Sequence, residues 1–163
     1  MALRRRCRSL GGMSTDRCPD FACPGSDGRT WTRADLKGSL SVLYFYPKDL
    51  TSGCTAESCD FRDHLKEFAK LSARVLGVSP DSLASHAKFI AKEKLTFPLL
   101  ADESHTMSEA FGVWTQKSMY GRTYMGIERS TFLIGPDLRI ERAWRKVKVP
   151  GHVAEVLAAI RGL

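Results

Sequence analysis

Residues 41–59 read SVLYFYPKDLTSGCTAESC, and the rest of the chain is organised around this stretch. Its first part, up to Tyr46, is mainly apolar and aromatic and predicts a buried strand. Apolar residues at helical spacing follow it and predict a helix over about 53–71. The chain therefore leaves a buried strand, turns, and enters a helix whose first turn carries Cys54.

Cys54 is a candidate nucleophile because of its place at the start of a helix. The first N–H groups of a helix have no partner within the helix, and they carry the positive end of the helix dipole. Both features favour a thiolate over a thiol, and the thiolate is the reactive form of cysteine.

A second cysteine, Cys59, lies five positions after Cys54. A regular helix places two such residues about 140° apart, with Cα atoms about 8.7 Å from each other. A disulfide tolerates a Cα separation of at most about 7 Å. Either the two thiols are unrelated, or the first turns of the helix unwind, which is cheap compared with global unfolding. We hypothesise that Cys54 is oxidised in place and then captured by Cys59 after local unfolding.

The chain has 163 residues, of which 43% are hydrophobic, enough for one domain with a substantial core. No apolar stretch is long enough for a transmembrane helix. The formal charge is +7, and five arginines but one acidic residue fall within residues 1–17. We expect residues 1–17 to form a flexible basic arm and 18–163 to form the domain. The arm could touch nucleic acid or an anionic surface, be a transit remnant, or precede a true start at Met13.

The five cysteines are an odd number, and no secretory signal precedes them, which indicates a reducing compartment, by default the cytoplasm. Cysteines in such a compartment are more often catalytic or metal-binding than structural. We expect Cys18 and Cys23 to pack in the core and Cys7 to be an exposed thiol. The four histidines show no metal-ligand spacing and are interpreted as surface or capping residues: His64, His86, His105 and His152.

The remaining pattern predicts an α/β fold. A short hairpin at about 18–32 precedes the organising strand. We expect strands over 41–46, 74–79, 97–102, 130–135 and 138–144, helices over 53–71, 80–94, 104–111 and 152–160, and a long loop over 112–126. Strands linked by helices, followed by a hairpin, give a mixed central sheet with helices on both faces.

The spacing Pro47-x-x-x-Thr51-x-x-Cys54 resembles the active-site motif of the peroxiredoxins. The companion Cys59 is similar to that of the bacterioferritin comigratory protein, or peroxiredoxin Q, branch. Three further segments match the same branch: GIERSTFLI at 126–134, FPLLAD at 97–102 and GVW at 112–114. The resemblance covers about residues 19–163. It implies a thioredoxin-like fold and a peroxidase that needs no cofactor and no metal.

The resemblance also implies roles for individual residues. Cys54 would attack the peroxide and become a sulfenic acid, and Cys59 would resolve it as an intramolecular disulfide. Thr51 would hydrogen-bond the sulfur or the peroxide, and Pro47 would shield the pocket. Arg129 would lie beside Cys54, favour its thiolate and hold a peroxide oxygen.

Two more positions belong to the implied site, and one departs from it. Gly53 would help to form the substrate site, and Glu57 would buttress the arginine. The family usually carries proline where this chain has Ser52, so we expect a less rigid loop and a modestly slower reaction.

The expected partners are a peroxide, which can be hydrogen peroxide or an organic hydroperoxide, and a dithiol reductant, which is thioredoxin or a similar protein. We expect no nucleic acid and no membrane as partners. The expected state is a monomer, with a weak dimer as the alternative.

Three other functions remain open. A cysteine-based metal-binding or redox-sensing module without turnover would use the two Cys-x4-Cys pairs, whose spacing lies at the edge of the usual zinc pattern. A thioredoxin-type disulfide reductase would need Cys-x-x-Cys, which is absent from the sequence. Binding of nucleic acid or a surface would depend on the arginine-rich arm.

Overall fold

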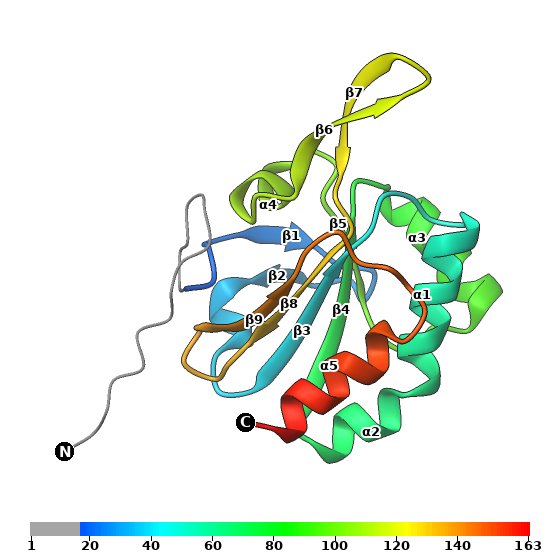
Figure 1. Ribbon diagram of the computed structural model, residues 1–163. Helices are drawn as coiled ribbons and strands as arrows, with labels where there is room; N and C mark the ends of the chain where they lie inside the picture. The colour runs from blue at the N-terminus through cyan, green and yellow to red at the C-terminus, as the bar shows by residue number, and fades with distance from the viewer. Residues whose placement is uncertain (1–16) are drawn as a thin grey trace.

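The computed structural model describes residues 17–163, which form a five-stranded mixed sheet covered on both faces (Figure 1). The strand order is β5-β4-β3-β8-β9. The strands span Leu99–Ala101 (β5), Ala73–Ser79 (β4), Leu40–Phe45 (β3), Ser130–Ile134 (β8) and Ile140–Trp144 (β9). Strand β3 is central, parallel to β4 and antiparallel to β8. The predicted α/β class with a mixed central sheet is confirmed.

The other elements cover this sheet. They are β1 (Ala22–Pro24), β2 (Thr30–Thr32), the 3-10 helix η1 (Arg33–Leu36), α1 (Ser52–Asp63), α2 (Leu65–Lys70), α3 (Leu83–Glu93), α4 (Thr106–Ala110), β6 (Trp114–Met119), β7 (Arg122–Ile127) and α5 (His152–Arg161). Helices α1, α2, α3 and α5 pack on one face, and the β1–β2 hairpin, η1 and α4 pack on the other.

The organising strand supplies both halves of the core. Val42 and Tyr44 face the helices α1, α2, α3 and α5, whereas Leu43 and Phe45 face the opposite layer. All four side chains are fully buried. Successive side chains of a strand point to opposite faces, so a strand buried on both faces has a continuous apolar sequence, as this one has.

The prediction of a single helix over 53–71 is wrong in one respect, because the segment is divided into two helices at His64. This residue has φ −102° and ψ 5°, outside the helical range, and ends α1 before α2 begins. Its ring Nδ1 lies 2.8 Å from the carbonyl oxygen of Asp60. A side chain that hydrogen-bonds this carbonyl competes with the backbone for it, which favours a break.

The prediction of a loop over 112–126 is also wrong, because most of this segment forms a β-hairpin. Strands β6 and β7 pair antiparallel around Tyr120 and Gly121, whose φ angles are +50° and +76°. Two central residues with positive φ form the tight turn that matches the twist of a hairpin. The hairpin projects from the body of the molecule (Figure 1). Its residues are mostly exposed, so the alternation of a half-buried strand is missing from the sequence.

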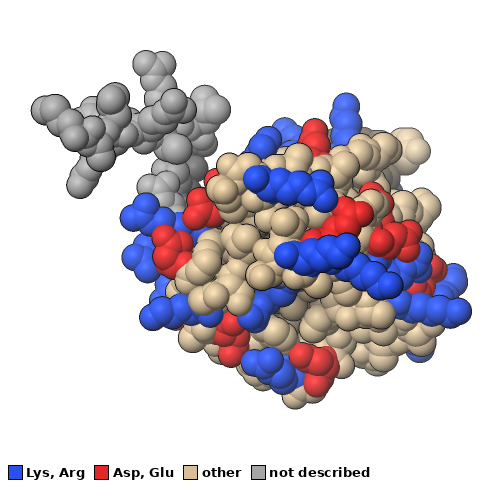
Figure 2. All heavy atoms as spheres, turned by 90° about the horizontal axis from the view of Figure 1, so that it is seen from below, with Lys and Arg blue, Asp and Glu red and all other residues tan. Residues whose placement is uncertain are grey.

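Residues 1–16 of the expected arm, with Cys7, lie outside the described part, and Arg17 forms a β-bridge with Arg139. Figure 2 shows one end of the molecule, where acidic side chains lie among basic ones. No helix within residues 17–163 is both long and apolar enough to cross a membrane.

Candidate active site

Cys54 is the third residue of α1, and a loop over residues 46–51 joins the carboxyl end of the central strand β3 to this helix (Figure 1). The residue before the helix, Thr51, is extended, with φ −85° and ψ 154°, so the chain changes direction there. The thiol is only 1% exposed. Its place in the first turn puts it among backbone N–H groups that have no partner within the helix.

Arg129 joins Cys54 to Glu57. The Nη2 atom of Arg129 donates to the sulfur of Cys54 across 3.2 Å, and its Nη1 atom donates to Oε1 of Glu57 across 2.8 Å. Cys54 and Glu57 are three positions apart and therefore lie on one face of the helix. The arginine reaches them from the short connection between β7 and β8. A guanidinium so placed stabilises negative charge on the sulfur.

The Glu57 carboxyl is almost completely enclosed, at 1% exposure. Burial raises its pKa to about 7, and the charge and hydrogen bond of Arg129 oppose that rise. Within the described residues, its Oε2 atom has no hydrogen-bond partner. The carboxyl therefore holds the arginine in place without fully neutralising it over the neutral pH range.

Gly53 leaves room for the guanidinium. A Cβ atom at this position would lie 3.3 Å from Nη2 of Arg129, closer than most real Cβ contacts. Any larger residue would press on the atom that contacts the thiol.

Pro47 and Thr51 lie near the two ends of the loop, and their side chains differ in exposure. The Thr51 hydroxyl is exposed and donates to the carbonyl oxygen of Lys48 across 2.9 Å. In this orientation the hydroxyl oxygen can still accept a hydrogen bond from a peroxide O–H. The Pro47 ring is half-buried at the start of the loop.

A buried polar network anchors the loop to α3, and sequence reasoning missed it. The Asp49 carboxylate accepts hydrogen bonds from Tyr46 Oη (2.6 Å), Ser85 Oγ (2.9 Å) and His86 Nδ1 (2.7 Å). The other ring nitrogen of His86 lies 2.9 Å from the carbonyl oxygen of Leu100. Both ring nitrogens of His86 thus lie against oxygen atoms, one from the loop and one from β5.

The expectation that all four histidines are surface or capping residues is therefore wrong for His86 and His152, which are 0% and 3% exposed. His152 Nε2 lies 2.7 Å from Oγ1 of Thr131. Burial lowers the pKa of His152 to about 4, and the positive charge of Arg129 adds to the effect. A sequence signal existed for His86, since it lies three positions before the buried Phe89 on α3.

Cys59 lies in the same helix as Cys54 and faces α3 instead of the site. Its sulfur donates to Oε2 of Glu93 across 3.4 Å, and Arg62 donates to the Glu93 carbonyl. Burial raises the pKa of Cys59, and the hydrogen bond to Glu93 raises it further. The four cysteines of the described chain are all free thiols.

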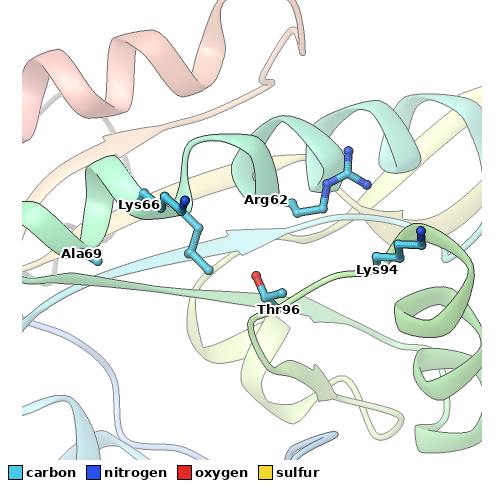
Figure 3. A pocket seen from close by; sticks show the side chains of 6 residues that line it. Arg62, Lys66, Ala69, Lys94 and Thr96 are labelled. Carbon is cyan, nitrogen blue, oxygen red and sulfur yellow. The ribbon is translucent and has the colours of Figure 1, made fainter.

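A basic hollow adjoins this second cysteine. It has a volume of about 610 Å³ and lies between α1–α2 and the segment after α3 (Figure 3). Its lining combines cations with apolar surface: Arg62, Leu65, Lys66, Ala69, Lys94 and Thr96. Arg62 connects this hollow to the contact between Cys59 and Glu93.

Cys18 and Cys23 are core residues, each 1% exposed, as expected. Burial raises the pKa of both thiols to about 12. They are therefore poor nucleophiles at neutral pH. Over residues 17–163, no three His, Cys, Asp or Glu side chains gather into a potential metal site.

Comparisons with known proteins identify the family of the chain. Residues 15–143 match the model of the AhpC/TSA family. The chain is 52% identical to Peroxiredoxin Bcp of Bacillus subtilis over 147 residues, covering 90% of this chain and 94% of that protein. It is 42% identical to Peroxiredoxin Bcp of Escherichia coli over 142 residues, covering 87% and 91%.

Solved structures give the same answer. Peroxiredoxin Q of Xanthomonas campestris superimposes with a TM-score of 0.84 at 47% identity, covering 87% of this chain and 90% of that one. The chain therefore belongs to the AhpC/TSA family, in its Bcp or peroxiredoxin Q branch, and it is a peroxiredoxin-type thiol peroxidase.

Proposed function

We propose that Cys54 is the nucleophile with which this peroxidase reduces hydrogen peroxide and organic hydroperoxides. The observation that carries the proposal is the 3.2 Å contact between Arg129 Nη2 and the Cys54 sulfur. The thiolate attacks one peroxide oxygen and the O–O bond breaks. Sulfur keeps that oxygen as a sulfenic acid, and the other oxygen takes a proton and leaves as water or alcohol. A related Xanthomonas campestris bacterioferritin comigratory protein has been solved in connection with alkyl peroxide reduction.

Ionisation of the thiol alone accounts for little of the rate. A free thiol is about 3% ionised at neutral pH, so full ionisation accelerates attack about 30-fold. The remainder comes from orienting the peroxide and stabilising charge on the leaving oxygen. We assign the stabilisation of charge to the Arg129 guanidinium, and the orientation of the peroxide to this guanidinium and to the Thr51 hydroxyl, whose oxygen accepts from the peroxide O–H. Gly53 and Glu57 keep the guanidinium in position, and Pro47 limits access of water to the loop.

In the second half of the cycle, Cys59 attacks the sulfenic sulfur, a disulfide forms and water leaves. In an intact α1 the two thiols are too far apart to bond, so the first turns must open. Opening also breaks the contact between Cys59 and Glu93. A dithiol of the thioredoxin type then reduces the disulfide by exchange. Sulfur itself carries the two electrons, so the proposed cycle requires no cofactor.

We also propose that the protein acts as a monomer in the cytoplasm. The odd number of cysteines supports a reducing compartment. Light scattering measures the molar mass of the reduced protein and so tests whether it is a monomer.

The decisive experiment treats the fully reduced protein with one equivalent of hydrogen peroxide and maps its thiols by peptide mass spectrometry. A rapid Cys54–Cys59 link supports the whole cycle. Retained sulfenic or sulfinic acid on Cys54 would make it a one-cysteine enzyme. A link from Cys54 to Cys18 or Cys23 would move resolution to the N-terminal segment. An unmodified Cys54 would overturn its role as nucleophile.

A further inference from the structure

A second hollow has the active-site arginine, Arg129, in its lining. Its volume is about 370 Å³. It is lined by the hairpin strand β6, the connection before β8 and the segment after β9: Thr115, Gln116, Lys117, Glu128, Arg129, Lys146 and Val147. The N–H of Val147 donates to the Arg129 carbonyl across 2.9 Å, which fixes the last segment beside the active-site arginine.

The charges that line this hollow are unbalanced. Arg129 is engaged with Glu57 and Cys54. The Glu128 carboxylate is bound by Arg145 at 2.6 Å. Lys117 and Lys146 take part in no ion pair within residues 17–163. Two cations therefore line the hollow without an ion-pair partner, and the one carboxylate of the lining, Glu128, is bound by Arg145.

The structure holds Lys117 in position. Its aliphatic chain passes over Gly126 on the paired strand, where a Cβ atom would lie 3.2 Å from Lys117 Cδ. Burial lowers the pKa of Lys117, and the charge of Arg129 lowers it further, while Cys54 and Glu128 oppose this. Lys117 and the active-site Arg129 line the same hollow.

Lys146 is held in a less common conformation. Its φ is +49°, in the left-handed region that side chains other than those of glycine, asparagine and aspartate rarely adopt. The adjacent Val147 bond to Arg129 keeps the chain in this turn. Strain of this kind is retained where the surrounding structure imposes it, often at binding sites.

We propose that Lys117 and Lys146 form an anion subsite, so that the enzyme prefers hydroperoxides that carry a carboxylate group over neutral ones of the same shape. The proposal rests on the proposed function, with Cys54 as the attacked thiol. The hydroperoxide end lies against Cys54 and Arg129, and the carboxylate extends into the hollow toward the two ammonium groups. Hydrogen peroxide is too small to reach them.

A matched pair of substrates tests the subsite. Cumene hydroperoxide is neutral, and its para-carboxylate derivative has the same reacting group with a charge at the far end. The second-order rate constant for oxidation of reduced Cys54 is measured for each by rapid quench with no reductant present, which removes any effect on recycling. At low salt we expect the carboxylate to react about tenfold faster, and this ratio to shrink at high salt.

The variants Lys117→Met and Lys146→Met, and the two combined, should bring the ratio of the two rate constants close to one. A purely structural effect would slow both substrates together and leave the ratio unchanged. Lys117→Arg should restore most of the preference. The matched control is Lys148→Met, which removes an exposed cation that does not line the hollow.

Three outcomes would overturn the proposal. They are equal rate constants for the two substrates in the wild type, a preference that survives in the double variant, and an equal loss of preference in Lys148→Met. Reaction of Cys54 with hydrogen peroxide is measured alongside. If that reaction is normal while the preference is absent, only the subsite fails; if it is also absent, the proposed nucleophile fails with it.

Discussion

One guanidinium connects two residues on the same face of a helix: Arg129 Nη2 lies 3.2 Å from the Cys54 sulfur, and its Nη1 lies 2.8 Å from Glu57 Oε1. The buried carboxylate fixes the direction of the fork, so the second nitrogen can point only at the thiol. Arg129 contacts the sulfur directly, whereas Glu57 acts on the sulfur only by positioning Arg129. Substitutions of the two residues can therefore be tested separately.

Arg129→Lys should slow oxidation of Cys54 by hydrogen peroxide about 100-fold. Lysine keeps the charge but cannot donate to the sulfur and to Glu57 with a planar fork. The rate is measured in a single turnover by trapping the remaining thiol. Arg145→Lys, which alters an exposed arginine bound to Glu128, serves as the control. An unchanged rate in Arg129→Lys would show that charge alone is sufficient.

Glu57→Gln should change how stability depends on pH. The pKa of Glu57 is raised from its usual 4.5 to about 7 in the folded protein, so the native state retains a proton that the unfolded chain loses. Its contribution is complete below about pH 4.5 and is lost as the pH rises to about 7. Urea unfolding at several pH values should therefore show the wild type losing stability relative to Glu57→Gln across this window. Parallel curves for the two proteins would contradict the shift.

His86→Leu should destabilise the protein by about 3 kcal/mol, because the buried Asp49 carboxylate loses one of its three side-chain hydrogen-bond donors, and the one that it pairs with as an ion. The loop before Cys54 should loosen as well, since Asp49 belongs to it. Adding Asp49→Asn should cost less than the sum of the single changes, as a double-mutant cycle from urea unfolding would reveal. Additive losses would mean that the two side chains do not interact.

Cys59→Ser should consume one equivalent of peroxide at the normal rate and then stop turning over with thioredoxin. The first step uses Cys54 alone, and the second needs the thiol that is missing. The assay compares the burst with the steady state. Undiminished turnover over many cycles would remove Cys59 from the mechanism.

The sequence predicted the parts of this protein that depend on local pattern. The buried strand β3 and the helix start near Cys54 were predicted correctly, because burial and helix geometry determine the order of apolar and polar residues along the chain. The hairpin of β6 and β7 has no such sequence pattern, since its side chains are mostly exposed and its turn at Tyr120 and Gly121 depends on backbone angles.

Contacts between distant segments were predictable only by resemblance or not at all. Arg129 and Cys54 are 75 positions apart, and no spacing rule joins them. Asp49 and His86 are 37 positions apart, and their contact was not predicted, because the sequence around a single histidine on a helix does not indicate which residue it contacts. The fold brings both pairs together by placing β8 and α3 near the end of β3.

The contact between Cys59 and Glu93 has a consequence for how the enzyme fails. In the proposed cycle, the Cys54–Cys59 disulfide cannot form until Cys59 leaves Glu93 on α3, and during that delay the sulfenic acid of Cys54 is exposed to further peroxide. A second oxidation gives a sulfinic acid, which thiols do not reduce. In the proposed cycle, a stronger contact between Cys59 and Glu93 therefore lowers the number of cycles that an enzyme molecule completes before peroxide permanently inactivates it.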